Sequence, residues 1–340
     1  MITANYSVMH FFVDFLCAWG IFRNFQTGSG AYQNYLIYNF CAFALQMPLG
    51  ILLDVLRSRV SDSLRPWLGQ IWVFAGIFLT AAGVFTHPAI LGVGNALFHV
   101  GAGLDVICED FAKGHSGRSL GVFVAPGAVG LYLGTILGKH PGDRLSWLLS
   151  LSVLVILLAA LFTKLPQESV PQSAAHPRKL PILLLSCFAV VVLRSWTGFQ
   201  TNFAWKSTLP LLAVLAVSSG KTLGGFASAR FGHGRTMVCS LLLASICFLL
   251  GENPIFGLLG LLLFNMSMPV TLYLLAKHMP DTPGLAFGIL TFGLFLGFLP
   301  VYADVTIPMS ATSVCALGSI ISAILLYIGW KAVKEHAVSA

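Results

Sequence analysis

Long apolar segments separated by short polar connections set the organisation of this chain. Each is close to the roughly 20 residues that a helix needs to cross the hydrocarbon core of a bilayer. Their approximate bounds are 7–26, 32–55, 67–86, 88–110, 118–138, 145–163, 181–202, 208–229, 236–252, 254–276, 283–303 and 310–330. Because backbone groups in lipid must be satisfied within each segment, the pattern predicts about twelve transmembrane α-helices.

A basic, proline-containing stretch at residues 164–180 divides these segments into two runs of six. The sequence therefore predicts an all-α polytopic membrane protein with two pseudo-symmetric six-helix bundles. We expect an N-terminal bundle at 1–163, a cytoplasmic linker at 164–180 and a C-terminal bundle at 181–340.

Residues of the same type recur at corresponding places in the two halves. The pairs are Gly121 with Gly288, Gly130 with Gly297, Gly50 with Gly225, and Trp19 with Trp196. The first two pairs share one offset, since 288 − 121 and 297 − 130 are both 167. Chance alignment is the alternative, because glycines are common in membrane helices. Parallel-repeat transporters have two such halves, with the substrate site between them near the bilayer midplane.

Composition excludes a soluble protein, because only 9% of the 340 residues are charged and 57% are hydrophobic, against about 25% charged in soluble domains. The net charge of +7 is attributed to cytoplasmic loops rather than to a nucleic-acid partner. The seven cysteines form no CxxC pair. We expect no metal site, no cofactor, no catalytic site and a monomer in the lipid bilayer.

Lysine and arginine gather on one predicted side of the membrane. With the N-terminus inside, the cytoplasmic connections and tail hold Arg57, Arg59, Arg65, Lys113, Arg118, Lys164, Arg178, Lys179, Arg230, Arg235, Lys277, Lys331 and Lys334. The opposite side holds Arg23, Lys139, Arg144 and Lys206. This bias predicts that both termini are cytoplasmic.

The connection after the second segment carries glycine, an acid and two arginines: Gly50, Asp54, Arg57 and Arg59. Glycine permits close helix approach, and a carboxylate at the membrane edge can accept hydrogen bonds from a neighbouring helix N-terminus. The pattern resembles the signature of the major facilitator superfamily, without its usual second glycine, and the likeness extends over the whole chain. A basic loop that only sets topology is the alternative.

The second half echoes this motif at residues 225–235, but the acid position is Ala229. The resemblance therefore implies an asymmetric gate at the cytoplasmic side, formed by Gly50, Asp54, Arg57, Arg59, Asp105 and Arg230. Asp105 has a packing role as its alternative, and Glu109 and Asp110 are expected to be solvated at the loop edge.

Three short stretches, at residues 10–14, 94–99 and 193–196, resemble fosmidomycin-resistance-type exporters within that superfamily. Val100 stands where that subgroup would have proline. The resemblance implies a proton-coupled antiporter that exports a small organic molecule, in the bacterial cytoplasmic membrane.

Polar residues inside the first and fourth segments are candidates for proton coupling. His10 and Asp14 share a helix face at i, i+4 spacing, and so do Asn95 and His99. A carboxylate beside an imidazole can exchange a proton near neutral pH, and transporters use such residues as relays. For the histidines a structural hydrogen bond is the alternative.

Arg194 lies in the seventh segment, where an arginine costs at least roughly 2.5–3.5 kcal/mol on insertion scales. We expect it to face a central cavity, to contact the substrate and to pair with Asp14 when the carrier is empty. The other candidate substrate contacts are Lys221, Asn95, Trp19 and Trp196. Snorkelling toward water is the alternative for Lys221, and an interfacial belt is the alternative for the tryptophans.

Two functions therefore remain open: a proton-coupled exporter of a small organic molecule, or an importer or facilitator of a small organic anion. The cationic residues Arg194 and Lys221 favour the second. A membrane enzyme is disfavoured, because the sequence offers no nucleophile–base set and no histidine-rich metal motif.

The charge bias predicts that the 164–180 linker is accessible from the cytoplasm. A single cysteine at position 172, in a cysteine-free background, should react with an impermeant maleimide only after the membrane is opened. Labelling of intact cells at this position would contradict the topology.

Overall fold

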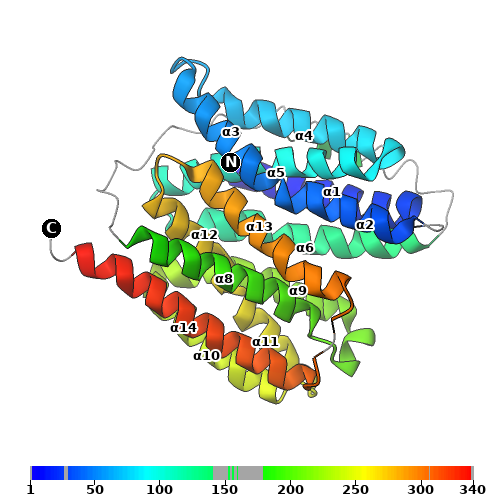
Figure 1. The fold of residues 1–340 in the computed structure, drawn as a ribbon, viewed down its shortest axis with the longest axis vertical. Coiled ribbons are helices and arrows are strands. Elements are labelled where there is room, and N and C mark those ends of the chain that lie inside the picture. The colour runs from blue at the N-terminus through cyan, green and yellow to red at the C-terminus, as the bar shows by residue number, and fades with distance from the viewer. Residues whose placement is uncertain are drawn as a thin grey trace.

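A computed structural model describes residues 2–26, 30–140, 179–305 and 307–337, together with 152, 153, 155, 156 and 159. Within these residues all regular secondary structure is helical, and the helices form two bundles that lie side by side (Figure 1). The predicted fold class, an all-α polytopic membrane protein with two bundles, is confirmed. The sixth predicted segment and the linker lie almost wholly outside the described residues.

Five predicted segments of the first half correspond to helices. These are α1 (Ile2–Gly20) with the π-helical turn η1 (Ile21–Phe25), α2 (Ala31–Asn39) with η2 (Phe40–Ala44) and α3 (Gln46–Arg59), α4 (Trp67–Thr86), α5 (Pro88–Ala112) and α6 (Arg118–Lys139). α1 packs along α6, and α4 packs along α5.

All six predicted segments of the second half are present. They are α8 (Leu180–Phe199), α9 (Pro210–Phe231) after the 3₁₀ turn η3 (Ala204–Ser207), α10 (His233–Leu249), α11 (Pro254–Asn265) with α12 (Ser267–His278), α13 (Pro283–Tyr302) and α14 (Ala311–Ala337). Nine helical stretches of the described chain are long and apolar enough to cross a membrane, and α10 is apolar but shorter.

Two helix pairs make the largest contacts between the halves, α3 with α13 and α6 with α9, and glycines allow each pair to touch. A Cβ on Gly50 would overlap the Gly284 carbonyl, and one on Gly225 would overlap the Gly117 carbonyl. We call these contacts the α3–α13 seam and the α6–α9 seam. Both lie at the end of the protein where α3 and α9 end and α6 and α13 begin, here named the terminal end.

Corresponding glycines of the two halves make corresponding contacts. Gly121 of α6 lies against the Lys221 carbonyl of α9, as Gly288 of α13 lies against the Gln46 carbonyl of α3. In the same way, Gly130 meets the Phe11 carbonyl of α1, and Gly297 meets the Val192 carbonyl of α8. The glycine pairs found in the sequence are therefore a structural repeat and not a chance alignment.

The seams differ in the hydrogen bonds that cross them. Asp54, at the end of α3, accepts hydrogen bonds from the backbone N–H groups of Gly284 (2.9 Å) and Leu285 (2.8 Å) at the start of α13. This confirms the expected bond from a carboxylate to a neighbouring helix N-terminus. Across the α6–α9 seam, the Ser228 hydroxyl donates to the Ser116 carbonyl (2.8 Å).

The acids at the end of α5 are buried, so the expectation of solvated loop-edge charges is wrong. Asp110 is fully buried and accepts from the backbone N–H groups of Gly117 (3.0 Å) and Leu120 (3.2 Å). Glu109 accepts from the Thr3 backbone N–H (2.8 Å). These carboxylates cap the start of α6 and hold the start of α1, both within the first half.

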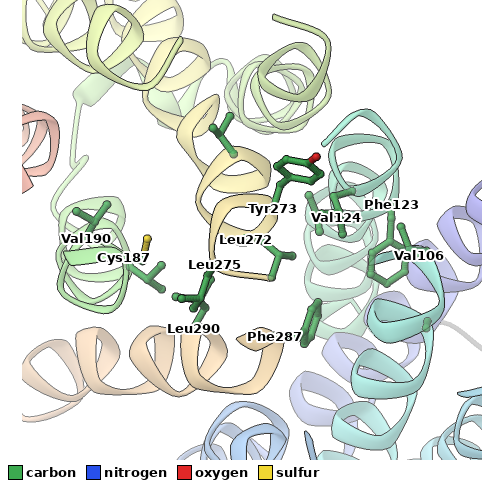
Figure 2. Packing of buried hydrophobic residues seen from close by; sticks show 14 of the residues in the cluster. Val106, Phe123, Val124, Cys187, Val190, Leu272, Tyr273, Leu275, Phe287 and Leu290 are labelled. Atoms are coloured by element: carbon green, nitrogen blue, oxygen red, sulfur yellow. The ribbon is translucent and has the colours of Figure 1, made fainter. Parts of the chain in front are cut away.

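Apolar side chains from both halves fill the space between the seams (Figure 2). Phe287 of α13 lies so close to α5 that a Cβ on Gly103 would overlap its ring. Tyr273 of α12 packs against Phe111 of α5, with ring centroids 5.2 Å apart. The seams and these side chains together close the terminal end.

Gly50→Ala should open the terminal end, because overpacking against the Gly284 carbonyl costs about 1–3 kcal/mol. A cysteine placed at Tyr273, which is buried here, should then react with a hydrophilic maleimide about fivefold faster or more. Gly198→Ala is the matched control, since a Cβ there meets no atom within 4 Å. Equal labelling in Gly50→Ala and the parent would show that this seam does not hold the closed end.

Candidate functional site

A cavity of about 380 Å³ lies between the halves. This volume falls in the range of small-molecule sites, about 300–1,000 Å³. Its walls are largely apolar, with a few convergent polar side chains: His10, Asp14, Tyr38, Asn39, Gln46, His99, Arg194, Ser195, Lys221, Asn265 and Thr291.

The first half contributes a compact cluster around Asp14, which we call the Asp14 cluster. The Asp14 carboxylate lies 3.1 Å from His10 Nε2 and 3.7 Å from His99 Nε2. It also accepts a hydrogen bond of 3.1 Å from Asn95 Nδ2. The sequence predicted two pairs, each on one helix face: His10 with Asp14, and Asn95 with His99. The structure shows that these faces of α1 and α5 are in contact.

Backbone groups and one glycine hold this cluster in place. His10 Nδ1 lies 2.8 Å from the Phe123 carbonyl of α6, and His99 Nδ1 lies 2.9 Å from the Asn95 carbonyl. Gly127 of α6 leaves the space that the cluster occupies, because a Cβ there would overlap His10 Nε2 and the Asp14 carboxylate. The carboxylate and both imidazoles are thereby oriented toward one another.

Arg194 enters the cavity from α8 and has no protein partner within the described parts of the chain. Its side chain is largely buried, with 8% exposure, and it makes no hydrogen bond or ion pair there. The expected pairing with Asp14 is not formed, because Asp14 is bound by His10, His99 and Asn95 instead. The guanidinium is left available to a ligand in the cavity.

Lys221 of α9 adds a second cation to the cavity wall. Its ammonium group lies 3.3 Å from the Val124 carbonyl of α6 and is close enough to Asp14 and Arg194 to interact with both charges. The Lys221 ammonium group therefore has a partner inside the protein and does not have to extend toward water at the membrane surface. Cations from the second half face the Asp14 cluster of the first half across one space.

The other expected substrate contacts lie elsewhere. Asn95 sits behind Asp14, where it also donates to Cys17 Sγ (3.4 Å), and does not line the cavity. Trp19 and Trp196 do not line this cavity, nor a second cavity that adjoins it at Arg194. Sequence reasoning missed other polar lining residues, notably Gln46 and Asn265, although each interrupts an apolar segment and could have been noticed on that basis.

The residues expected to form a gate lie around the terminal end but differ in exposure. Asp105 is buried and accepts from the Tyr6 hydroxyl at 2.7 Å, within the first half. Arg57 is half-buried, and its guanidinium lies 3.9 Å from Cys108 Sγ. Arg59 and Arg230 are exposed. Gly50 and Asp54 make contacts that cross between the halves.

Access to the cavity runs toward the end opposite the terminal end. A second cavity of about 350 Å³ shares Arg194 with the first and continues between α6 and α9, past Tyr132 and Pro210. The α2–α13 side is closed at this end, where Tyr32 and Tyr302 stack with ring centroids 3.9 Å apart. The two cavities therefore extend from the closed terminal end along the α6–α9 side toward the opposite end.

The Asp14 cluster can share a cation, since its ligand atoms all lie within 4.8 Å of one another. The two histidine Nε2 atoms are only 2.9 Å apart. A tetrahedral zinc ion, with Zn–N distances of about 2.0–2.1 Å, would hold two nitrogens about 3.3 Å apart. The observed contact fits a proton better than a metal ion.

No protein-family model and no curated protein sequence matches the chain. Solved structures do. The E. coli fucose:proton symporter FucP aligns with a TM-score of 0.62 at 16% identity, over 98% of both chains. FucP in the outward conformation, titled a major facilitator superfamily transporter, aligns with a TM-score of 0.60 at 17% identity, over 97% of this chain and 99% of that chain.

The human organic anion transporter MFSD10 (TETRAN) aligns with a TM-score of 0.66 at 16% identity, over 95% of this chain and 98% of the other. The chain has the fold of major facilitator superfamily transporters. This agrees with the resemblance seen in the Gly50–Arg59 motif. The likeness to fosmidomycin-resistance-type exporters remains an expectation from the sequence.

The unpaired, buried guanidinium of Arg194 leads to a prediction that can be tested without knowing the substrate. Arg194→Met should raise the melting temperature of the purified, ligand-free protein by several degrees, because it removes a guanidinium that costs at least roughly 2.5–3.5 kcal/mol in the membrane. Arg230→Met, at an exposed position, should leave it nearly unchanged. A lower melting temperature in Arg194→Met would mean that the arginine has a structural partner.

Proposed function

We propose that the chain is a proton-coupled secondary transporter that moves a small organic molecule by alternating access between its two halves. The observation that carries the proposal is the cavity in which the Asp14 cluster of the first half faces Arg194 of the second. A titratable cluster and a free cation in one closed-ended cavity are the parts that linked binding of a proton and a substrate requires.

Arg194 is assigned to bind an anionic or strongly polar part of the substrate. A mid-membrane guanidinium needs a counter-charge or water, and within the described residues no carboxylate lies in ion-pair contact with it. A substrate carboxylate, phosphate or phosphonate would supply two acceptor oxygens for the planar fork of arginine. Lys221 would add a second positive charge to the same group or to a neighbouring one.

Two candidate functions, which differ in the direction of transport, are supported by different observations. Export by proton antiport is the function that the resemblance to fosmidomycin-resistance-type exporters supports. Uptake or facilitated passage of an organic anion is the second candidate, and the two cations of the cavity favour it. The structural neighbours include a proton symporter and an organic anion transporter, which is compatible with the second candidate.

The proposed setting is the bacterial cytoplasmic membrane, with both termini in the cytoplasm and the protein acting as a monomer. In this orientation the terminal end is cytoplasmic, and the cavity of this structure is entered from outside. The proposed moving units are residues 1–163 and 181–340, connected by the linker at 164–180. Closure of the α6–α9 entrance and opening of the seams would expose Arg194 to the cytoplasm.

Proteoliposomes test the proposal once comparison of metabolites in cells with and without the gene has identified the substrate. The parent should move substrate against its gradient when a pH gradient is imposed. Asp14→Asn should lose this accumulation but keep substrate exchange, because the cluster loses its carboxylate and the cavity is kept. Arg194→Ala should lose both, and Arg194→Lys should not restore binding, since lysine lacks the fork.

The sign of the pH gradient that drives accumulation separates antiport from symport. Substrate movement that ignores the pH gradient in the parent would contradict proton coupling. Full accumulation by Asp14→Asn would remove the Asp14 cluster from the mechanism.

A further inference from the structure

The hydrogen bonds of the Asp14 cluster determine where its hydrogen atoms lie. His10 Nδ1 faces the Phe123 carbonyl at 2.8 Å, and His99 Nδ1 faces the Asn95 carbonyl at 2.9 Å. A carbonyl oxygen can only accept, so each Nδ1 must carry a hydrogen and donate it. Both imidazoles therefore turn their Nε2 atoms toward the centre of the cluster.

The two Nε2 atoms of His10 and His99 are 2.9 Å apart, at hydrogen-bonding distance. If both rings were neutral, each Nε2 would be bare and two lone pairs would face each other. One hydrogen between them turns this contact into an N–H···N hydrogen bond. The ring pair then carries three hydrogens on four nitrogens, which amounts to one positive charge.

The Asp14 carboxylate is placed as the counter-charge of this pair. Its Oδ2 lies 3.1 Å from His10 Nε2 and its Oδ1 lies 3.7 Å from His99 Nε2, while Oδ1 also accepts from Asn95. Moving the hydrogen to Asp14 would leave the lone pair of His99 Nε2 directed at His10. The geometry is therefore satisfied when Asp14 is ionised and the hydrogen lies between the rings.

We propose that the proton bound by this carrier is held between His10 and His99, shared by their Nε2 atoms, while Asp14 remains a carboxylate. The inference rests on the proposed function and makes it more specific, because the sequence pointed to Asp14 as the group that is protonated. Asp14 becomes a positioning residue that stabilises the charged ring pair.

Groups from the surrounding helices limit the pair to one proton. Lys221 of α9 interacts with Asp14 from across the cavity, and Arg194 of α8 lies beyond it. Tyr38 of α2 and Cys17 of α1 lie beside Asp14. From α6, the Phe123 carbonyl, the Phe123 ring and Gly127 face the imidazoles, and none of these groups is charged. Two nearby cations and a single carboxylate disfavour a second imidazolium.

Release of the proton has a structural consequence. When Nε2 gives the proton to water in the cavity, the N–H···N bond is replaced by two lone pairs, and the ring contact between α1 and α5 loses its attraction. His99 and Arg194 line the same cavity, so an anion held there would retain the proton by its charge. Loading of substrate and of proton are thus linked through the ring pair.

Infrared difference spectroscopy of the purified protein, taken across the pH range of proton binding, tests the assignment. The expected spectrum contains imidazolium bands that shift when histidine is isotopically labelled. Any C=O stretching band of a protonated carboxyl group should come from other acids and persist in Asp14→Asn. Labelling the parent in this way keeps the test valid even if a variant does not fold. A protonated-carboxyl band that disappears in Asp14→Asn would overturn the proposal.

Proton uptake measured in weakly buffered detergent solution gives a second readout. His10→Gln and His99→Gln should each bind one proton fewer than the parent. Gly198→Ala adds no titratable group, and its Cβ meets no atom within 4 Å, so it should match the parent. Unchanged uptake in both cluster variants would overturn the assignment. Histidine bands in a protein whose transport ignores pH would instead support the proton site and contradict the proposed function.

Discussion

Close approach of backbone to backbone at the two seams is the constraint on which the architecture depends. At Gly50 and Gly225 the helices of opposite halves touch with no side chain between them, and this contact is possible only for glycine. Because these crossings hold one end of the halves together, the other end can stand apart around a cavity. The position of Arg194 opposite the Asp14 cluster follows from this geometry.

The repeat between the two halves does not extend to the side chains that form hydrogen bonds across the seams. In the α3–α13 seam, Asp54 binds the start of a helix from the other half. In the α6–α9 seam, the start of α6 is bound by Asp110 of its own half, and Ala229 stands at the position equivalent to Asp54. The α6–α9 pair is crossed instead by bonds from the Ser218 and Ser228 hydroxyls and the Lys221 ammonium group to α6-side carbonyls, so the two pairs are held by different chemistry.

Much of this architecture could be predicted, because spanning helices are defined by local apolar runs and the glycine repeat is visible in the sequence. The i, i+4 pairs also located Asp14, His10 and His99 correctly on shared faces. The partners of Asp110, and the lack of a partner for Arg194 within the described residues, could not be predicted, because they depend on how separate helices rotate against each other. Tryptophans were misleading for the same reason: Trp19 and Trp196 hold equivalent places in the repeat, yet neither reaches the cavity.

In the proposed transport cycle, the placement of Arg194 and Lys221 would make reorientation sensitive to membrane voltage. A full elementary charge crossing 100 mV changes free energy by about 2.3 kcal/mol. Reorientation without substrate would expose these two cations first to one compartment and then to the other, and so would carry positive charge through part of the electric field. A bound anion would offset that charge by the amount of its own. A negative interior would therefore draw the empty carrier toward its inward-facing form and leave the loaded carrier less affected, so that the electrical potential, as well as the proton gradient, sets the rate of the return step.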